Sequence, residues 1–120
     1  MALHNQFGKD AEAIAVKYLI DHGYEILFQN WRHPPYEIDI IATKNDLLHI
    51  IEVKARKTSA FGYPEESVSK TKLRSIMKAA DEFLFQNQKY RHVQFDVLSI
   101  ILAKNSEVEF FLIEDVYLLG

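Results

Sequence analysis

The fold of this chain is decided by two apolar stretches, Glu37-Ile38-Asp39-Ile40-Ile41 and Leu47-Leu48-His49-Ile50-Ile51-Glu52-Val53-Lys54. Both stretches are predicted to be core β-strands, because they are short apolar runs rich in β-branched residues. Core strands rarely carry ionised side chains, since an unpaired buried charge is costly. Asp39, Glu52 and Lys54 therefore indicate a functional site within the core sheet.

The two strands are separated by a turn signal, Lys44-Asn45-Asp46. If Asn45 and Asp46 form a two-residue turn, Asp39 lies directly opposite Glu52, whereas a three-residue turn shifts the register. Like charges that face each other destabilise a sheet, and a divalent cation between them removes the conflict. Oxygen ligands of this kind suit Mg²⁺. The spacing therefore predicts a Mg²⁺ or Mn²⁺ site.

Lys54 follows Glu52 by two residues, so its side chain points to the same face of the strand. An ammonium there can orient a water or stabilise charge on a phosphate, and a metal can activate that water. These are the parts needed to hydrolyse a phosphodiester. The alternative is structural: surface strands with a Glu37–Lys54 salt bridge and unrelated acids, since ion-pair networks also occupy such positions.

The rest of the chain predicts an α/β sandwich of order αβββαββ around a central mixed sheet flanked by helices. Gly23 is expected to end the first helix in a left-handed conformation. Beyond the two central strands, the expected elements are a helix over 5–22, a strand over 24–31, a helix over 67–88, and strands over 93–102 and 108–113.

Composition places the chain among ordinary globular proteins. With 120 residues, 48% of them hydrophobic and 26% charged, it is expected to form a single domain over residues 1–120. The absence of cysteine excludes disulfides and thiolate metal sites, and suits a reducing cytoplasm. No run approaches the length of a membrane span, so the expectation is a cytoplasmic protein with no membrane partner.

Basic residues are concentrated in one part of an otherwise acidic chain. The net charge is −3, but residues 54–78 carry seven basic and two acidic side chains, a local charge of +5. Lys70, Arg74 and Lys78 form a stripe at i, i+4 and i+8 of the second expected helix. A local basic stretch can bind a polyanion. An ordinary solvated surface would have the same composition.

The acids and lysine also match a known pattern. Ile38-Asp39 followed by Glu52-Val53-Lys54 resembles the PD-(D/E)XK nuclease signature, with isoleucine in place of proline. The wider sequence resembles the YraN-type family of small bacterial proteins over nearly its whole length. The matching segments include Gly8-Lys9-Asp10-Ala11-Glu12, Asn30-Trp31-Arg32, Glu37-Ile38-Asp39, Glu52-Val53-Lys54-Ala55-Arg56, Phe61-Gly62-Tyr63-Pro64, Lys72 and Phe95-Asp96-Val97. The chain departs from the family at Gln94, where an arginine is common.

The resemblance implies a restriction-endonuclease-like fold, similar to that of archaeal Holliday junction resolvases. It implies that Asp39 and Glu52 bind the metal, with the Val53 carbonyl as a third ligand, and that Lys54 is the catalytic lysine. Glu12, on the first helix, would complete the site. Without the resemblance, Glu12 is expected on a solvated face.

Further roles follow from the same resemblance. Glu37 would support Lys54 or the metal, and Lys72 would contact phosphate. The other expected nucleic-acid-binding residues are Arg56 and the stripe of Lys70, Arg74 and Lys78. Junction resolvases cut two strands symmetrically as dimers, so a homodimer is an expectation that the resemblance alone carries.

Three hypotheses remain open at this point. The first is a metal-dependent endonuclease acting on DNA, including branched or junction DNA, with repair or recombination as the process by analogy. The second is a non-catalytic nucleic-acid-binding module on the same fold, suggested by the basic stripe. The third is a protein-interaction adaptor, which rests on the apolar residues 110–119.

Overall fold

The computed structural model describes residues 2–56, 70–102 and 107–115. Its elements are α1 (Ala2–Asp21), β1 (Glu25–His33), β2 (Tyr36–Lys44), β3 (Leu47–Arg56), α2 (Lys70–Gln86), β4 (Val93–Leu102) and β5 (Val108–Ile113). The expected αβββαββ order is confirmed, and β4 and β5 have the expected bounds. Helix α1 begins three residues earlier than expected, because Ala2 and Leu3 favour helix. Residues 67–69 of the second expected helix lie outside the described residues.

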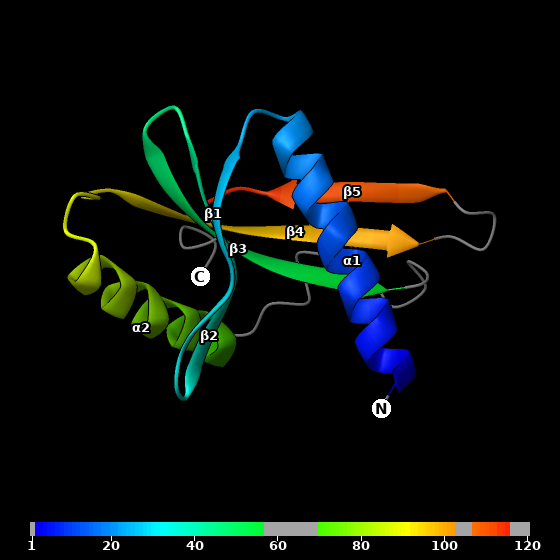
Figure 1. The fold of residues 1–120 in the computed structure, drawn as a ribbon, viewed down its shortest axis with the longest axis horizontal. Coiled ribbons are helices and arrows are strands. Elements are labelled where there is room, and N and C mark those ends of the chain that lie inside the picture. The colour runs from blue at the N-terminus through cyan, green and yellow to red at the C-terminus, as the bar shows by residue number, and fades with distance from the viewer. Residues whose placement is uncertain (1, 57–69, 103–106, 116–120) are drawn as a thin grey trace.

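The strands form one mixed sheet in the order β1-β2-β3-β4-β5. Among the described strands, only the β3–β4 pair is parallel, and α2 falls between these two strands in the chain, as a parallel connection requires. The α1 helix crosses one face of the sheet and α2 lies on the other (Figure 1). This α/β sandwich is consistent with the restriction-endonuclease-like fold.

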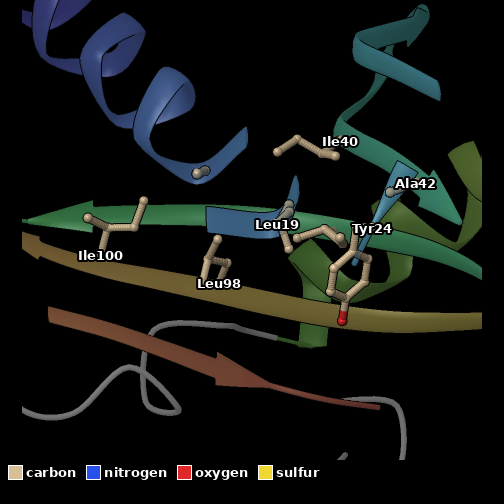
Figure 2. Packing of buried hydrophobic residues seen from close by; sticks show 8 residues of the cluster. Leu19, Tyr24, Ile40, Ala42, Leu98 and Ile100 are labelled. Atoms are coloured by element: carbon tan, nitrogen blue, oxygen red, sulfur yellow. The ribbon is translucent and has the colours of Figure 1, made fainter. Parts of the chain in front are cut away.

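The core on the α1 side is built from helix residues packed on three strands. Ala15 and Leu19 of α1 belong to a buried layer that includes Ile40, Leu98 and Ile100. Figure 2 shows Leu19 among these strand residues. Gly23 ends the helix with φ of 91°, as the sequence predicts. The layer fixes the position of α1 across the strands that carry the candidate site.

The β2–β3 hairpin has the register that the candidate site needs. Asn45 and Asp46 have φ of 52° and 64°, the paired positive values of a two-residue type I′ turn. The ladder then runs regularly from the Lys44–Leu47 pair, next to the turn, to Ile40 opposite Ile51. The expected two-residue turn is confirmed. On this register the next facing pair is Asp39 and Glu52.

Strand β2 twists sharply at Asp39. Ile38 packs in the core cluster under α2, whereas Ile40 packs in the cluster under α1. Residues two apart in a regular strand point to the same face, so the backbone must rotate between them. Asp39 therefore lies where β2 changes faces. Its carboxylate does not follow the regular alternation that would place it in one of the two buried layers.

A second buried acid, Asp96, has a structural environment. Its Oδ2 accepts a hydrogen bond from His49 Nδ1 at 2.7 Å, and its Oδ1 accepts bonds from Gln94 Nε2 and the Asp115 backbone N–H, each at 2.9 Å. The Tyr24 ring stands edge-on to His49 at 5.0 Å. Burial, and next to it the Asp96 charge, raises the pKa of Tyr24 to about 12. His49 is thus a packed residue whose ring nitrogen is bonded to Asp96.

Asp96→Ala should destabilise the protein by about 3 kcal/mol, because it leaves three buried or partly buried donors without an acceptor. Urea denaturation followed by circular dichroism measures the change. The matched control is Asp81→Ala on the exposed face of α2, which should cost under about 0.5 kcal/mol. Equal stability of the two variants would contradict the structural role of Asp96.

Candidate metal centre

The carboxylates of Asp39 and Glu52 meet between β2 and β3, one position beyond the Ile40–Ile51 pair at which the ladder ends. Asp39 Oδ2 accepts a hydrogen bond from the Val53 backbone N–H at 2.9 Å. Glu52 is only 6% exposed, and Asp39 is partly buried. Both predicted ligands are thus brought together inside the protein, as the sequence spacing indicates.

Burial changes the pKa of both carboxylates. Burial raises the pKa of Glu52 to about 7, and the neighbouring Asp39 charge adds to the effect, while Lys72 and Lys54 oppose it. Burial also raises the pKa of Asp39, opposed by its hydrogen bond from Val53. Two buried carboxylates that face each other resist being ionised together, because their like charges repel. A divalent cation is one way to relieve this repulsion.

Two lysines approach the same oxygen of Glu52. Lys54 Nζ lies 3.9 Å from Oε1, and Lys72 Nζ lies 3.4 Å from it. Lys54 comes from β3 itself, whereas Lys72 comes from the first turn of α2. The structure therefore places Lys72 at the acid pair. Both ammonium groups are partly exposed, with 33% and 45% of the side chain accessible, so they can also reach a ligand from solvent.

Glu37 lies near the pair but has a different ion partner from the one the sequence indicates. Its Oε1 is 3.6 Å from Arg32 Nε on β1, and this pair is largely exposed. Its charge contributes, as the smallest of the causes, to the raised pKa of Asp39. Glu37 therefore acts on the site through its field, while Lys54 pairs with Glu52.

Glu12 is carried by α1 on the other face of the sheet from α2. It is partly exposed, and its Oε2 accepts a hydrogen bond from Asn30 Nδ2 on β1 at 3.2 Å. Within the described ranges, no three His, Cys, Asp or Glu side chains are grouped closely enough to hold a metal together. Glu12 thus lies outside the Asp39–Glu52 pair, which leaves two carboxylates as the candidate ligands.

The basic stripe is exposed on α2, as the sequence predicts. Lys70, Arg74 and Lys78 are all exposed, while Arg56 is partly buried at the end of β3. Lys72 on the same helix reaches Glu52, but it lies two positions, about 200° around the helix, from Lys70 and from Arg74. The stripe and the lysine at the acid pair therefore occupy different sides of α2.

Ser99 is a residue that the sequence interpretation missed. It pairs with Lys54 across the parallel β3–β4 ladder and is 2% exposed. Its Oγ has no hydrogen-bond partner among the residues that the structure describes. Buried unpaired hydroxyls often mark a bound water or ligand. In the sequence, Ser99 could have been noticed as the single hydroxyl side chain within the apolar run of residues 97–102.

These groups fit a hard divalent cation. The donor set is the two facing carboxylates, whose pKa values are raised by burial first and, for Glu52, also by the charge of Asp39. Mg²⁺ and Mn²⁺ take one or two carboxylates together with waters, so no further protein acid is required. The pair is therefore chemically suited to such an ion.

Without metal, the protein should lose stability as the pH rises from 5 to 8. Glu52 ordinarily titrates at 4.5 but at about 7 in the fold, so the folded state keeps a proton that the unfolded chain releases. The stabilisation is complete below pH 4.5 and is lost as the pH passes 7, a change on the order of 3 kcal/mol. Thermal denaturation in EDTA measures it.

The control for this pH effect is the isosteric variant Glu52→Gln, which should remove most of the fall in stability. Glu109→Gln, on an exposed position of β5, should leave the fall unchanged. If wild type and Glu52→Gln lost stability equally between pH 5 and pH 8, the buried acid pair would not be its source.

Comparison with known proteins identifies related chains. The model of the uncharacterised protein family UPF0102 matches residues 11–100. A UPF0102 protein of Bacteroides thetaiotaomicron is 43% identical over 101 residues, which cover 84% of each chain. One from Flavobacterium psychrophilum is 38% identical over 112 residues, covering 92% of this chain and 94% of the relative. The family expected from the sequence is confirmed. No helix in the described part of the chain is long and apolar enough to cross a membrane.

Proposed function

The chain belongs to the uncharacterised protein family UPF0102, and for this member we propose a metal-dependent endonuclease that hydrolyses phosphodiester bonds in DNA. The observation that supports it is the buried meeting of the Asp39 and Glu52 carboxylates, with two lysine ammonium groups at one of their oxygens. Paired acids with a raised pKa beside cations are typical of functional sites.

Asp39 and Glu52 would hold a Mg²⁺ or Mn²⁺ ion, with the Val53 carbonyl as an additional oxygen. When bound, the ion would polarise a phosphoryl oxygen and acidify a water. Lys54, on the same face as Glu52, would orient the attacking water and stabilise negative charge on the phosphate. Lys72, at the N-terminal end of α2, would bind a neighbouring phosphate.

The substrate is proposed from the charge distribution around the pair. Lys70, Arg74 and Lys78 form an exposed stripe along α2, the helix whose Lys72 reaches Glu52, and regularly spaced cations suit a phosphate backbone. DNA, and branched or junction DNA in particular, follows from the resemblance to resolvases. A homodimer would let two such sites cut opposed strands.

Asp39→Asn and Glu52→Gln should each reduce DNA cleavage by at least roughly 100-fold, because each removes a charged metal ligand and keeps the side-chain shape. The assay uses matched linear, flapped and four-way-junction DNA with Mg²⁺, Mn²⁺ or EDTA. Circular dichroism verifies that both variants are folded.

Asp46→Asn is the matched control, since it removes a carboxylate from the same hairpin at the exposed turn. Its cleavage rate should equal that of the wild type. Cleavage by Glu52→Gln at the wild-type rate would show a contaminating nuclease or a different active site, and in either case would refute the proposed mechanism.

A second candidate function is a non-catalytic nucleic-acid-binding module. The exposed stripe on α2 favours it, because phosphate contacts need no metal and no acid pair. The nuclease explains the buried acids as well as the stripe. The binding module explains the stripe alone, so the nuclease is preferred.

Replacing Lys70, Arg74 and Lys78 together by Gln should weaken DNA binding. The slope of log Kd against log salt concentration should fall by the equivalent of about two to three phosphate contacts. Fluorescence anisotropy at several salt concentrations in EDTA measures this slope. A triple replacement of exposed Lys17, Lys89 and Arg91 is the charge-matched control and should keep the wild-type slope. If both triple variants gave the same slope, α2 would be ruled out as the DNA-binding surface.

A further inference from the structure

The most exposed large apolar side chain in the described part of the chain is that of Phe85, near the end of α2. It is 63% exposed, more than Ile20, Phe28 or Val108. Phe83, two residues earlier, is fully buried where α2 packs on the sheet. Two helical positions differ by about 200° around the axis, so Phe85 projects from the solvent side of α2.

Phe85 continues the basic stripe of Lys70, Arg74 and Lys78. It follows Lys78 by seven residues, which places it about 10 Å further along the helix and within about 20° of the same direction. All three basic side chains are exposed. The outer side of α2 therefore carries a row of three cations that ends in an aromatic ring.

The make-up of this row indicates which kind of ligand would cover it. An apolar protein segment would bury Phe85 but would leave three cations without partners, which is costly. A partner that carries only negative charges would pair with the cations but would gain nothing from the ring. Single-stranded nucleic acid matches both parts, because it combines a chain of phosphates with flat aromatic bases that stack on such side chains.

Asp81 gives this match a direction. It is exposed and lies between Lys78 and Phe85 in the row, three residues after the first and four before the second. Its charge repels phosphates from the last turn of α2, whereas an uncharged base can still approach the ring. Phosphates are therefore expected at the three cations, and a base beyond them at Phe85.

We propose that the outer side of α2 binds single-stranded DNA, with the stripe holding the phosphates and Phe85 stacking on an unpaired base, an inference that rests on the proposed DNA substrate. In a duplex the bases are enclosed in the stack and cannot offer a face to a side chain. Phe85 thus distinguishes unpaired from paired DNA. The substrate class that follows is DNA that contains a single-stranded segment.

This binding site lies apart from the candidate metal centre. Lys72, on the inner side of the same helix, reaches Glu52, so the two sites are separated by at least the width of α2, about 10 Å. The outer side of α2 would therefore hold a single-stranded segment that flanks the cleaved bond. Its binding can be measured without metal and without cleavage.

The experiment measures fluorescence anisotropy in EDTA with two probes, a labelled oligothymidylate of about 12 nucleotides and a blunt duplex of the same length. Phe85→Leu should weaken oligothymidylate binding roughly tenfold, since leucine keeps an apolar side chain but removes the aromatic face. Duplex affinity should change less than about twofold, because the phosphate contacts of the stripe are kept. Phe85→Tyr, which keeps an aromatic ring, should bind both probes like the wild type.

Ile20→Ala is the matched control, because Ile20 is a similarly exposed apolar residue on the other helix, α1, with 54% of its surface accessible. It should bind both probes like the wild type, and circular dichroism verifies that every variant is folded. Wild-type oligothymidylate affinity of Phe85→Leu, or an equal loss on both probes, would overturn the role of Phe85 while leaving the nuclease intact.

A second copy of the chain is the alternative occupant of the Phe85 ring. Sedimentation velocity tests it with the wild type and Phe85→Ala. A wild-type dimer that Phe85→Ala converts to a monomer, with oligothymidylate binding unchanged, would assign Phe85 to self-association and overturn the inference. Failure of the wild type to bind either probe would refute the proposed DNA substrate together with this inference.

Discussion

The structure around the candidate site depends on one electrostatic constraint: two carboxylates, Asp39 and Glu52, are placed side by side in the core sheet. Apolar side chains at these positions would pack without penalty. The protein instead keeps both acids, and burial, with the Asp39 charge adding to its effect, raises the pKa of Glu52 to about 7. The hairpin register, the twist of β2 and the approach of Lys72 all act on this pair, because each changes the distance or the charge that the acids experience.

A comparison of the two buried acids separates function from structure. Asp96 is fully buried, yet donors from His49, Gln94 and the Asp115 backbone surround it and leave its charge balanced by hydrogen bonds. Glu52 faces another acid instead. The Phe95-Asp96-Val97 segment, which matches the family as well as the metal-site residues do, is therefore explained by folding. Gln94, where the family often has arginine, supplies one of the required donors.

Interactions between neighbouring residues explain why the register of the β2–β3 hairpin and the end of α1 could be predicted from the sequence. The Asn45-Asp46 turn sets its own register, and Gly23 ends α1 by its backbone freedom, so both follow from neighbouring residues. The contact of Lys72 with Glu52 could not be predicted by spacing, because it depends on how α2 packs on the sheet. The partner of His49 is 47 residues away in the chain. The left-handed backbone of Asn30, with φ of 52°, leaves no mark in the hydrophobic pattern of β1.

The net charge of the candidate site would couple the binding of a metal to the binding of the proposed substrate. Asp39 and Glu52 contribute two negative charges when ionised, and Lys54 and Lys72 contribute two positive ones, so the four side chains balance. A bound divalent cation would leave this group with an excess of two positive charges in a partly buried place, where screening is weak. Backbone phosphates are the natural source of the balancing negative charge. Metal and nucleic acid would then each raise the affinity of the other by the same factor, since coupling between two binding sites is reciprocal. With a cation bound, the acid pair would therefore favour a polyanionic partner, even on a chain whose net charge is −3.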